Sequence, residues 1–246
     1  QCKNEIHNIL QRANIKLTSY LSDIYGITGI TLLEMFIDGE VITEQTILPK
    51  IHGKVKATAA ELVEAMDGKL SFEDRFLLGQ SLEHYRHSVN QVEEITVVIK
   101  QYVLERFERE YNLLIELPGV SAIVACVILS EIGPNVEAFQ SQGNLASWAG
   151  VCPGSYESAG IKKSSHTTQG NKYLKSILFQ AGGTAGRSKD EAFHNLYARI
   201  SGRSSKMKAI IACAHKMIRV IYKILSTGEH YDAKKALGLR QQARAN

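Results

Sequence analysis

The fold is decided by the stretch from Ser71 to Tyr111, which reads SFEDRFLLGQSLEHYRHSVNQVEEITVVIKQYVLERFEREY. Ser71 followed three residues later by Asp74 is typical of a helix N-cap, and a helix over the whole stretch is roughly 60 Å long at 1.5 Å per residue. Steps of three and four residues place apolar side chains at seven of eight positions: Leu78, Leu82, Tyr85, Val89, Val92, Thr96, Ile99 and Val103. This spacing predicts a coiled-coil seam, and with it a homo-oligomer. A long core helix in one globular domain is the alternative.

The remainder of the chain is also predicted to be helical. Proline occurs four times, and few segments alternate apolar and polar residues with the period of a strand. The fold class is therefore all-α, with a long coiled-coil helical arm followed by a second helical domain. We expect an amphipathic helix over Lys3–Leu17 and another from about Thr28 to Ile37, closed by Gly39. The predicted domains are 1–110, a helical connector with the coiled-coil arm; 111–227, the second domain; and 228–246, a loose polar tail.

A proline-glycine turn begins the second domain, in the stretch ELPGVSAIVACVILSEIG from Glu116 to Gly133. Two helices joined by such a turn are typical of a helix-hairpin-helix motif, in which backbone N–H groups bind a phosphate. Gly119 and Ser121 are then candidate nucleic-acid-binding residues. A simple turn between two helices is the alternative interpretation.

Charge is distributed very unevenly along the chain. Residues 158–225 contain 13 basic and two acidic side chains, a net charge of +11, whereas residues 1–157 carry a net charge of −9. A one-sided basic segment predicts a polyanionic partner, most often nucleic acid. A solvated basic helical face is the alternative.

Several classes of protein are disfavoured by the sequence. No apolar run approaches the length of a membrane span, and there is no secretory signal pattern. The four cysteines form no CxxC pair, which argues against a zinc site and fits a reducing cytoplasm; Cys126 and Cys213 are predicted core residues. The chain has no phosphate-binding GxxxxGK[ST] or GxGxxG motif, and no metal site is predicted within it.

The polar stretch VCPGSYESAGIKKSSHTTQGN, from Val151 to Asn171, interrupts the helical pattern. It is predicted to be a loop that combines hydroxyl side chains, small residues and lysines, and it leads into a helix carrying Lys172 and Lys175. Such a loop suits phosphate binding. A serine attacking a phosphodiester is the sharper alternative, but a serine needs a base or metal ion that this half of the chain lacks.

These motifs together resemble one family. The stretch ELPGVSAIVACVILSEIG, the L-x-x-W-A-G-x-x-P-G turn, the E-S-A-G motif and Q-G-N-K-x-L-K are similar to the C-terminal domain of DEDD-type transposases of bacterial insertion sequences. This family is named after insertion sequences one-hundred-and-ten, one-hundred-and-sixteen and nine-hundred-and-two, and Piv-type DNA invertases are relatives. The opening helices also resemble the stretch that follows the catalytic domain in those proteins.

The resemblance implies a composite active site. Members of the family have an N-terminal RuvC-like domain whose acidic tetrad holds Mg²⁺. A dimerising coiled coil follows, and then a serine-bearing transposase domain. The family nucleophile falls on Ser158. The basic loop and helix of the family fall on residues expected to bind nucleic acid: Gly160, Lys162, Lys163, Gly170, Asn171, Lys172 and Lys175. Lys175 stands where the family often has arginine, which keeps the charge without the bidentate geometry.

The resemblance also implies what this chain lacks. It is expected to begin after the RuvC-like domain, so it has no cofactor of its own and is expected to be inactive alone. Its acids, such as Asp23, Glu34 and Asp38, are not assigned to the tetrad. The predicted function is a transposase or recombinase fragment of a bacterial or archaeal cytoplasm, with DNA and a guide RNA as partners. A non-catalytic helix-hairpin-helix module and a helical interaction scaffold are the alternatives.

Overall fold

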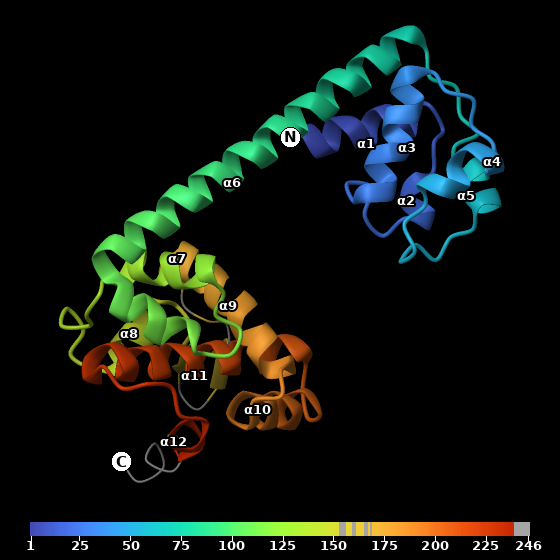
Figure 1. Cartoon of the computed structure of the whole chain (residues 1–246). Helices are drawn as coiled ribbons and strands as arrows, with labels where there is room; N and C mark the ends of the chain where they lie inside the picture. Colours follow the sequence, from blue (N-terminus) through green and yellow to red (C-terminus); the bar gives the residue numbers. More distant parts are fainter. Residues whose placement is uncertain (153–155, 159–160, 165–166, 168, 239–246) are drawn as a thin grey trace. The chain divides into compact units, whose positions relative to one another are not determined.

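The computed structural model describes residues 1–246 except 153–155, 159–160, 165–166, 168 and 239–246, and it describes only the backbone of 156–158 and 161–164. The chain divides into two compact units, Gln1–Glu94 and Ile95–Asn246. The predicted all-α class is confirmed, with one short two-stranded hairpin as an addition (Figure 1). The two units meet inside one long helix, whereas the boundary predicted after residue 110 stays a prediction.

Unit 1 is a cluster of short helices packed on the beginning of the long helix. Its elements are α1 (Cys2–Arg12), α2 (Leu17–Tyr20), α3 (Ile27–Asp38), α4 (Glu44–Ile47), η1 (Leu48–Lys50), α5 (Ala59–Ala65) and the first part of α6 (Phe72–Ile115). The helix predicted over Lys3–Leu17 is instead two helices, because Asn14 adopts a left-handed φ of 58° between them; asparagine tolerates this conformation better than most residues. The predicted end of α3 is confirmed, since Gly39 caps it at φ 69°.

Helix α6 contributes to the cores of both units. The predicted N-cap is confirmed, because the Ser71 hydroxyl accepts a hydrogen bond from the Asp74 N–H at 3.0 Å. Leu78 and Leu82 are buried in the unit 1 core and Val103 in the unit 2 core. Both ends of the predicted seam are thus occupied within the chain.

The centre of α6 has a different character. Apolar side chains are 41–65% exposed there: Val92, Ile95, Val97, Val98, Ile99 and Tyr102. Further along, the helix is kinked at Phe107, where φ is −139° and ψ is 35°. The coiled coil itself stays a prediction, and only this central part of α6 is left to form it.

Unit 2 is a helical domain built around α9. After α6 come α7 (Ala122–Ile132), α8 (Gln142–Trp148), α9 (Lys172–Arg187), α10 (Glu191–Ser201), α11 (Lys206–Thr227) and α12 (Ala233–Gly238). Helix α9 packs against α7, α10 and α11 (Figure 1). Cys126 and Cys213 are buried in this core, as predicted.

The crossing of α9 and α11 is close at one point. A side-chain Cβ atom on Gly182 would lie 2.7 Å from the Ala214 backbone nitrogen and 3.0 Å from its Cα atom. On Gly183, the next residue, it would lie 3.5 Å from the Ile210 side chain, an ordinary van der Waals distance. Gly182 therefore lets the two helix backbones approach each other.

The C-terminal segment contacts unit 2 through α12, where Ala236 is buried, and the predicted polar tail over 228–246 stays a prediction. The Tyr231 hydroxyl donates a hydrogen bond to Asp190 Oδ2 at 3.0 Å. Glu116 accepts the Tyr231 N–H at 3.2 Å and contacts His230 Nδ1 at 2.7 Å. The polar composition of this segment suggested a solvated tail. Sequence alone does not reveal that these polar groups bond to residues distant along the chain.

Candidate nucleic-acid interface

Ser158 lies on a β-hairpin rather than in an irregular loop. Strands β1 (Tyr156–Ser158) and β2 (Ile161–Ser164) pair antiparallel, with Ser158 opposite Ile161 and Glu157 opposite Lys162. Ser158 is thus the last paired residue before the turn, and Lys162 and Lys163 follow on the returning strand. Gly160 lies outside the described residues, as do the side chains of Ser158, Lys162 and Lys163. The structure places the backbones of Ser158, Lys162 and Lys163 on one hairpin.

The hairpin returns to α9, whose first turn is fixed by Asn171. The Asn171 Oδ1 atom accepts the N–H groups of Tyr173 at 3.0 Å and Leu174 at 2.9 Å, so it caps the helix. Its Nδ2 donates to Glu131 Oε2 at 2.5 Å. The predicted binding residue Asn171 therefore has a structural role, with its amide engaged by helix α9 and by Glu131.

Gly170 holds the same junction together from the other side. It has a left-handed φ of 54°, and a Cβ atom there would overlap the backbone of Gly150. The Asn171 N–H also donates to the Trp148 carbonyl oxygen at 3.0 Å. The end of α8 and the start of α9 are therefore locked together at the two ends of the segment that contains the hairpin.

The proline-glycine turn contacts the same helix further along. Gly119 has φ 83°, and a Cβ atom there would overlap the Ala181 carbonyl oxygen and lie 2.9 Å from the Ala185 nitrogen. Ser121 precedes α7, is exposed and makes no side-chain cap bond. Close packing against α9 thus explains a glycine at position 119 without any phosphate binding. The assignment of Gly119 and Ser121 to nucleic-acid binding stays a prediction.

The positive charge of the second half is largely, but not entirely, at the surface. By sequence, unit 1 has a net charge of −5 and unit 2 a net charge of +9. Lys216 is half-buried, and its Nζ donates to the Ala192 carbonyl oxygen at 2.8 Å; loss of solvation lowers the pKa of this lysine. Arg219 Nε donates to Gln142 Oε1 at 3.1 Å. These two cations support the fold, so the segment offers fewer charges to a polyanion than its sequence suggests.

Two exposed aromatic residues stand on the helices that precede and follow the hairpin in the sequence, and they were not among the predicted site residues. Trp148, at the end of α8, is 40% exposed, and Tyr173, in the first turn of α9, is 60% exposed. Lys172 Nζ lies 4.7 Å from the centre of the Tyr173 ring, and Lys175 Nζ lies 5.9 Å from the Phe179 ring. Sequence could have pointed to Trp148 through the W-A-G motif, but its exposure could not be predicted.

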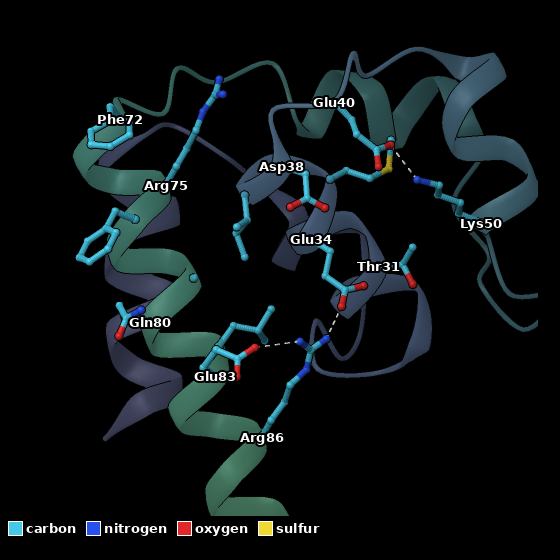
Figure 2. A pocket seen from close by; sticks show the side chains of 15 residues that line it. Thr31, Glu34, Asp38, Glu40, Lys50, Phe72, Arg75, Gln80, Glu83 and Arg86 are labelled. Carbon is cyan, nitrogen blue, oxygen red and sulfur yellow. Dashed lines mark hydrogen bonds and ion pairs between the residues drawn. The ribbon is translucent and has the colours of Figure 1, made fainter.

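A large cavity lies in unit 1, and none of the predicted site residues lines it. It has a volume of about 660 Å³ and lies between α3 and the start of α6 (Figure 2). Arg86 pairs with Glu34 and Glu83, and Lys50 Nζ lies 2.8 Å from Glu40 Oε2. The carboxylates of Glu34, Glu40 and Glu83 at this cavity are therefore paired with cations.

Within the described ranges, no three or more His, Cys, Asp or Glu side chains are grouped so as to hold a metal ion. In the same part of the chain, no helix combines the length and the apolar character needed to cross a bilayer.

Part of unit 2 is similar to a known protein family. Residues 111–198 match the family described as "Transposase IS116/IS110/IS902 family". The chain is also similar to "Putative transposase y4pF/y4sB" of Sinorhizobium fredii, with 30% identity over 157 residues, which cover 61% of this chain and 39% of that protein.

Two further relatives are DNA-inverting proteins by name. Both are called "Pilin gene-inverting protein". The one from Moraxella lacunata is 28% identical over 62% of this chain and 48% of its own length. The one from Moraxella bovis is 27% identical over 63% of this chain and 48% of its own length. The chain thus spans less than half the length of each relative. The matched segment contains the hairpin, Trp148, Asn171 and Tyr173.

Proposed function

Since residues 111–198 form a domain of the IS116/IS110/IS902 transposase family, we propose that this chain is part of a DNA transposase or recombinase. In this proposal the chain binds DNA and contributes Ser158 as the nucleophile for strand exchange. The family match carries the proposal, because its segment includes the hairpin on which Ser158 is the last paired residue. The basic character of unit 2 supports DNA as the substrate.

The proposed step forms a covalent link between protein and DNA. The Ser158 hydroxyl oxygen attacks a backbone phosphorus atom and forms an O–P bond. The bond from phosphorus to the departing deoxyribose oxygen breaks, and that oxygen takes up the proton lost by the serine. Attack on the phosphoserine by the hydroxyl of another strand rejoins DNA and restores the serine. Lysines of the hairpin and of α9 offset the charge that develops on the phosphate.

The remaining requirements lie with partners. A serine hydroxyl needs a base or metal ion for activation, and the resemblance assigns this role to a RuvC-like domain with Mg²⁺. A guide RNA and a bacterial or archaeal cytoplasm belong to the same proposal. Co-purification of a discrete RNA with the full-length protein tests the RNA partner, and recovery of no RNA would contradict it.

Replacement of Ser158 tests the nucleophile in the full-length protein. We expect Ser158→Ala to abolish recombination and the protein–DNA adduct on a denaturing gel, while DNA affinity stays within about twofold, since only the attacking oxygen is removed. Ser164→Ala, on the opposite strand of the hairpin, is the matched control and should retain both. Recombination by the Ser158→Ala variant would show that another group is the nucleophile.

A salt titration separates this proposal from a helical scaffold. Binding of the 246-residue chain to duplex DNA should weaken steeply with salt, with a slope of about −0.9 for each phosphate neutralised. A flat response would exclude a nucleic-acid interface. Salt-dependent binding by a full-length protein that forms no adduct would instead favour the non-catalytic binding module.

Self-association is proposed for the exposed centre of α6. Ile95, Val98, Ile99 and Tyr102 lie at helical spacing, and exposed apolar patches of this kind mark interaction sites. Sedimentation should show an oligomer of the chain that Ile95→Glu or Ile99→Glu disrupts. Val41→Glu is the control, because Val41 is 73% exposed in unit 1. A monomer at high protein concentration would contradict the proposal.

A further inference from the structure

We propose that Trp148 and Tyr173 form a stacking surface for unpaired bases of the DNA strand that reaches the Ser158 hairpin. This inference rests on the proposed function and adds two residues that position its substrate. The two aromatic side chains stand on the elements between which the hairpin is inserted, α8 and α9. The Asn171 N–H donates to the Trp148 carbonyl oxygen, so both aromatic residues stand where the segment that contains the hairpin leaves α8 and joins α9.

Trp148 is held in place while a large part of its side chain stays accessible. Its ring lies 5.3 Å from the Phe139 ring with an interplanar angle of 57°. The Phe139 carbonyl oxygen accepts the Tyr222 hydroxyl at 3.2 Å, which ties this aromatic pair to α11. With 40% of its surface exposed, Trp148 has a supported side and a side open to a ligand.

Tyr173 presents an aromatic ring next to a cation. It is 60% exposed, and the Lys172 ammonium lies 4.7 Å from the ring centre. A base that stacks on such a ring has a phosphate within reach of a neighbouring lysine. Grooves for single-stranded nucleic acid combine aromatic stacking with cations in this way.

The two aromatic side chains are joined by a rigid junction. The Asn171 N–H bonds to the carbonyl oxygen of Trp148, and Gly170 lies against Gly150 with no room for a side chain. Asn171 also occupies the nearby Glu131 carboxylate through its Nδ2 group. Little ordering of the protein is then needed on binding, which favours affinity.

The chemistry selects an unpaired strand over a duplex. A stacking side chain needs the face of a base, which neighbouring bases cover in duplex DNA. Single exposed aromatic residues are common and need no explanation. Here two of them, with an adjacent lysine, stand on the helices that precede and follow the hairpin that carries the proposed nucleophile.

Binding of short DNA oligonucleotides to the 246-residue chain tests the inference. Trp148 is the sole tryptophan, so its fluorescence should be quenched by single-stranded DNA and less by the matched duplex. Trp148→Leu and Tyr173→Leu should each weaken single-strand binding by about five-fold to a hundred-fold. Duplex binding and the salt slope should change little, because phosphate contacts are kept.

Matched variants distinguish stacking from general damage. Trp148→Phe and Tyr173→Phe keep a ring and should bind single strands much as the parent chain does. Phe72→Leu removes an aromatic ring that is 81% exposed in unit 1 and should have no effect. If Trp148→Leu is misfolded by circular dichroism, Tyr173→Leu decides, because its ring is largely outside the core.

The inference is overturned if both leucine variants bind single strands as tightly as the parent, or if an abasic oligonucleotide binds equally well. The proposed function survives that result if Lys172→Gln still weakens binding and flattens its salt dependence. If the parent chain binds no DNA, both the inference and the DNA-binding part of the proposed function fail.

Discussion

Two adjacent glycines in α9 should respond in opposite directions to the same substitution. Alanine is favoured over glycine inside a helix by about 0.8–1.0 kcal/mol. At Gly183 the new methyl group meets the Ile210 side chain at 3.5 Å, an ordinary contact distance. Gly183→Ala should therefore stabilise unit 2 by about 0.5–1 kcal/mol.

At Gly182 the same methyl group would contact backbone atoms of α11, which cannot rotate away as a side chain can. It would lie 2.7 Å from the Ala214 nitrogen and 3.2 Å from the Cys213 carbonyl carbon. Overpacking of a close helix contact costs about 1–3 kcal/mol, at the upper end where backbone must move. After subtraction of the helix preference, Gly182→Ala should destabilise unit 2 by about 1–2 kcal/mol.

Urea unfolding monitored through Trp148 measures this difference. The chain has one tryptophan and it belongs to unit 2, so the signal reports on that unit. With an m-value of about 2 kcal/mol per molar urea, the midpoints of the two variants should differ by about 0.8–1.5 M. Equal stabilisation by both substitutions would refute the close crossing of α9 and α11.

Three further predictions concern unit 2. Asn171→Ala should lower the free energy of unfolding by about 1–2 kcal/mol in the same urea assay, because a helix cap is lost. Asn171→Asp should restore only part of this stability, because its carboxylate would face the carboxylate of Glu131. The hydrogen bond from His230 and the Tyr231 N–H lower the pKa of Glu116 below its ordinary 4.5. The stability that these two hydrogen bonds contribute is therefore complete above pH 4.5 and is lost as the pH falls through the lower folded pKa of Glu116. Over that acidic range, amide exchange of residues 231–236, corrected for intrinsic rates, should become faster. The Glu116→Gln variant should not show this change. Burial raises the pKa of Cys213 to about 11, so mass spectrometry of alkylated peptides should find it labelled far more slowly than the partly exposed Cys2.

Helix boundaries could be predicted where local sequence signals were strong. The Ser71 cap and the Gly39 helix end follow from residues adjacent in sequence, and the structure confirms both. The break at Asn14 could not be predicted, since most asparagines inside a helical pattern do not adopt a left-handed conformation. The same limit applies to the hairpin, whose short strands lack a clear alternation of apolar and polar residues.

The remaining differences depend on tertiary contacts. Leu78, Leu82 and Val103 have the spacing of a seam, but periodicity alone does not reveal whether the partner is another chain or the protein's own core. Lys216 counted as surface charge in the sequence, whereas it is bonded to a carbonyl oxygen of α10. The role of Gly119 against α9 was hidden for the same reason, because its neighbours lie about sixty residues further along the chain.

The exposed centre of α6 also governs the stiffness of the helix at the junction of the two units. Residues 95–99 are Ile-Thr-Val-Val-Ile, five consecutive β-branched residues, and such residues lose side-chain rotamer freedom in a helix. At roughly 0.5 kcal/mol each relative to alanine, they weaken this part of the helix by about 2–3 kcal/mol, at the point where unit 1 gives way to unit 2. Elsewhere the two cores hold α6 in shape. Local melting of the helix should therefore begin in this segment. Any partner that covers residues 95–99 should stabilise the helix there and make it stiffer.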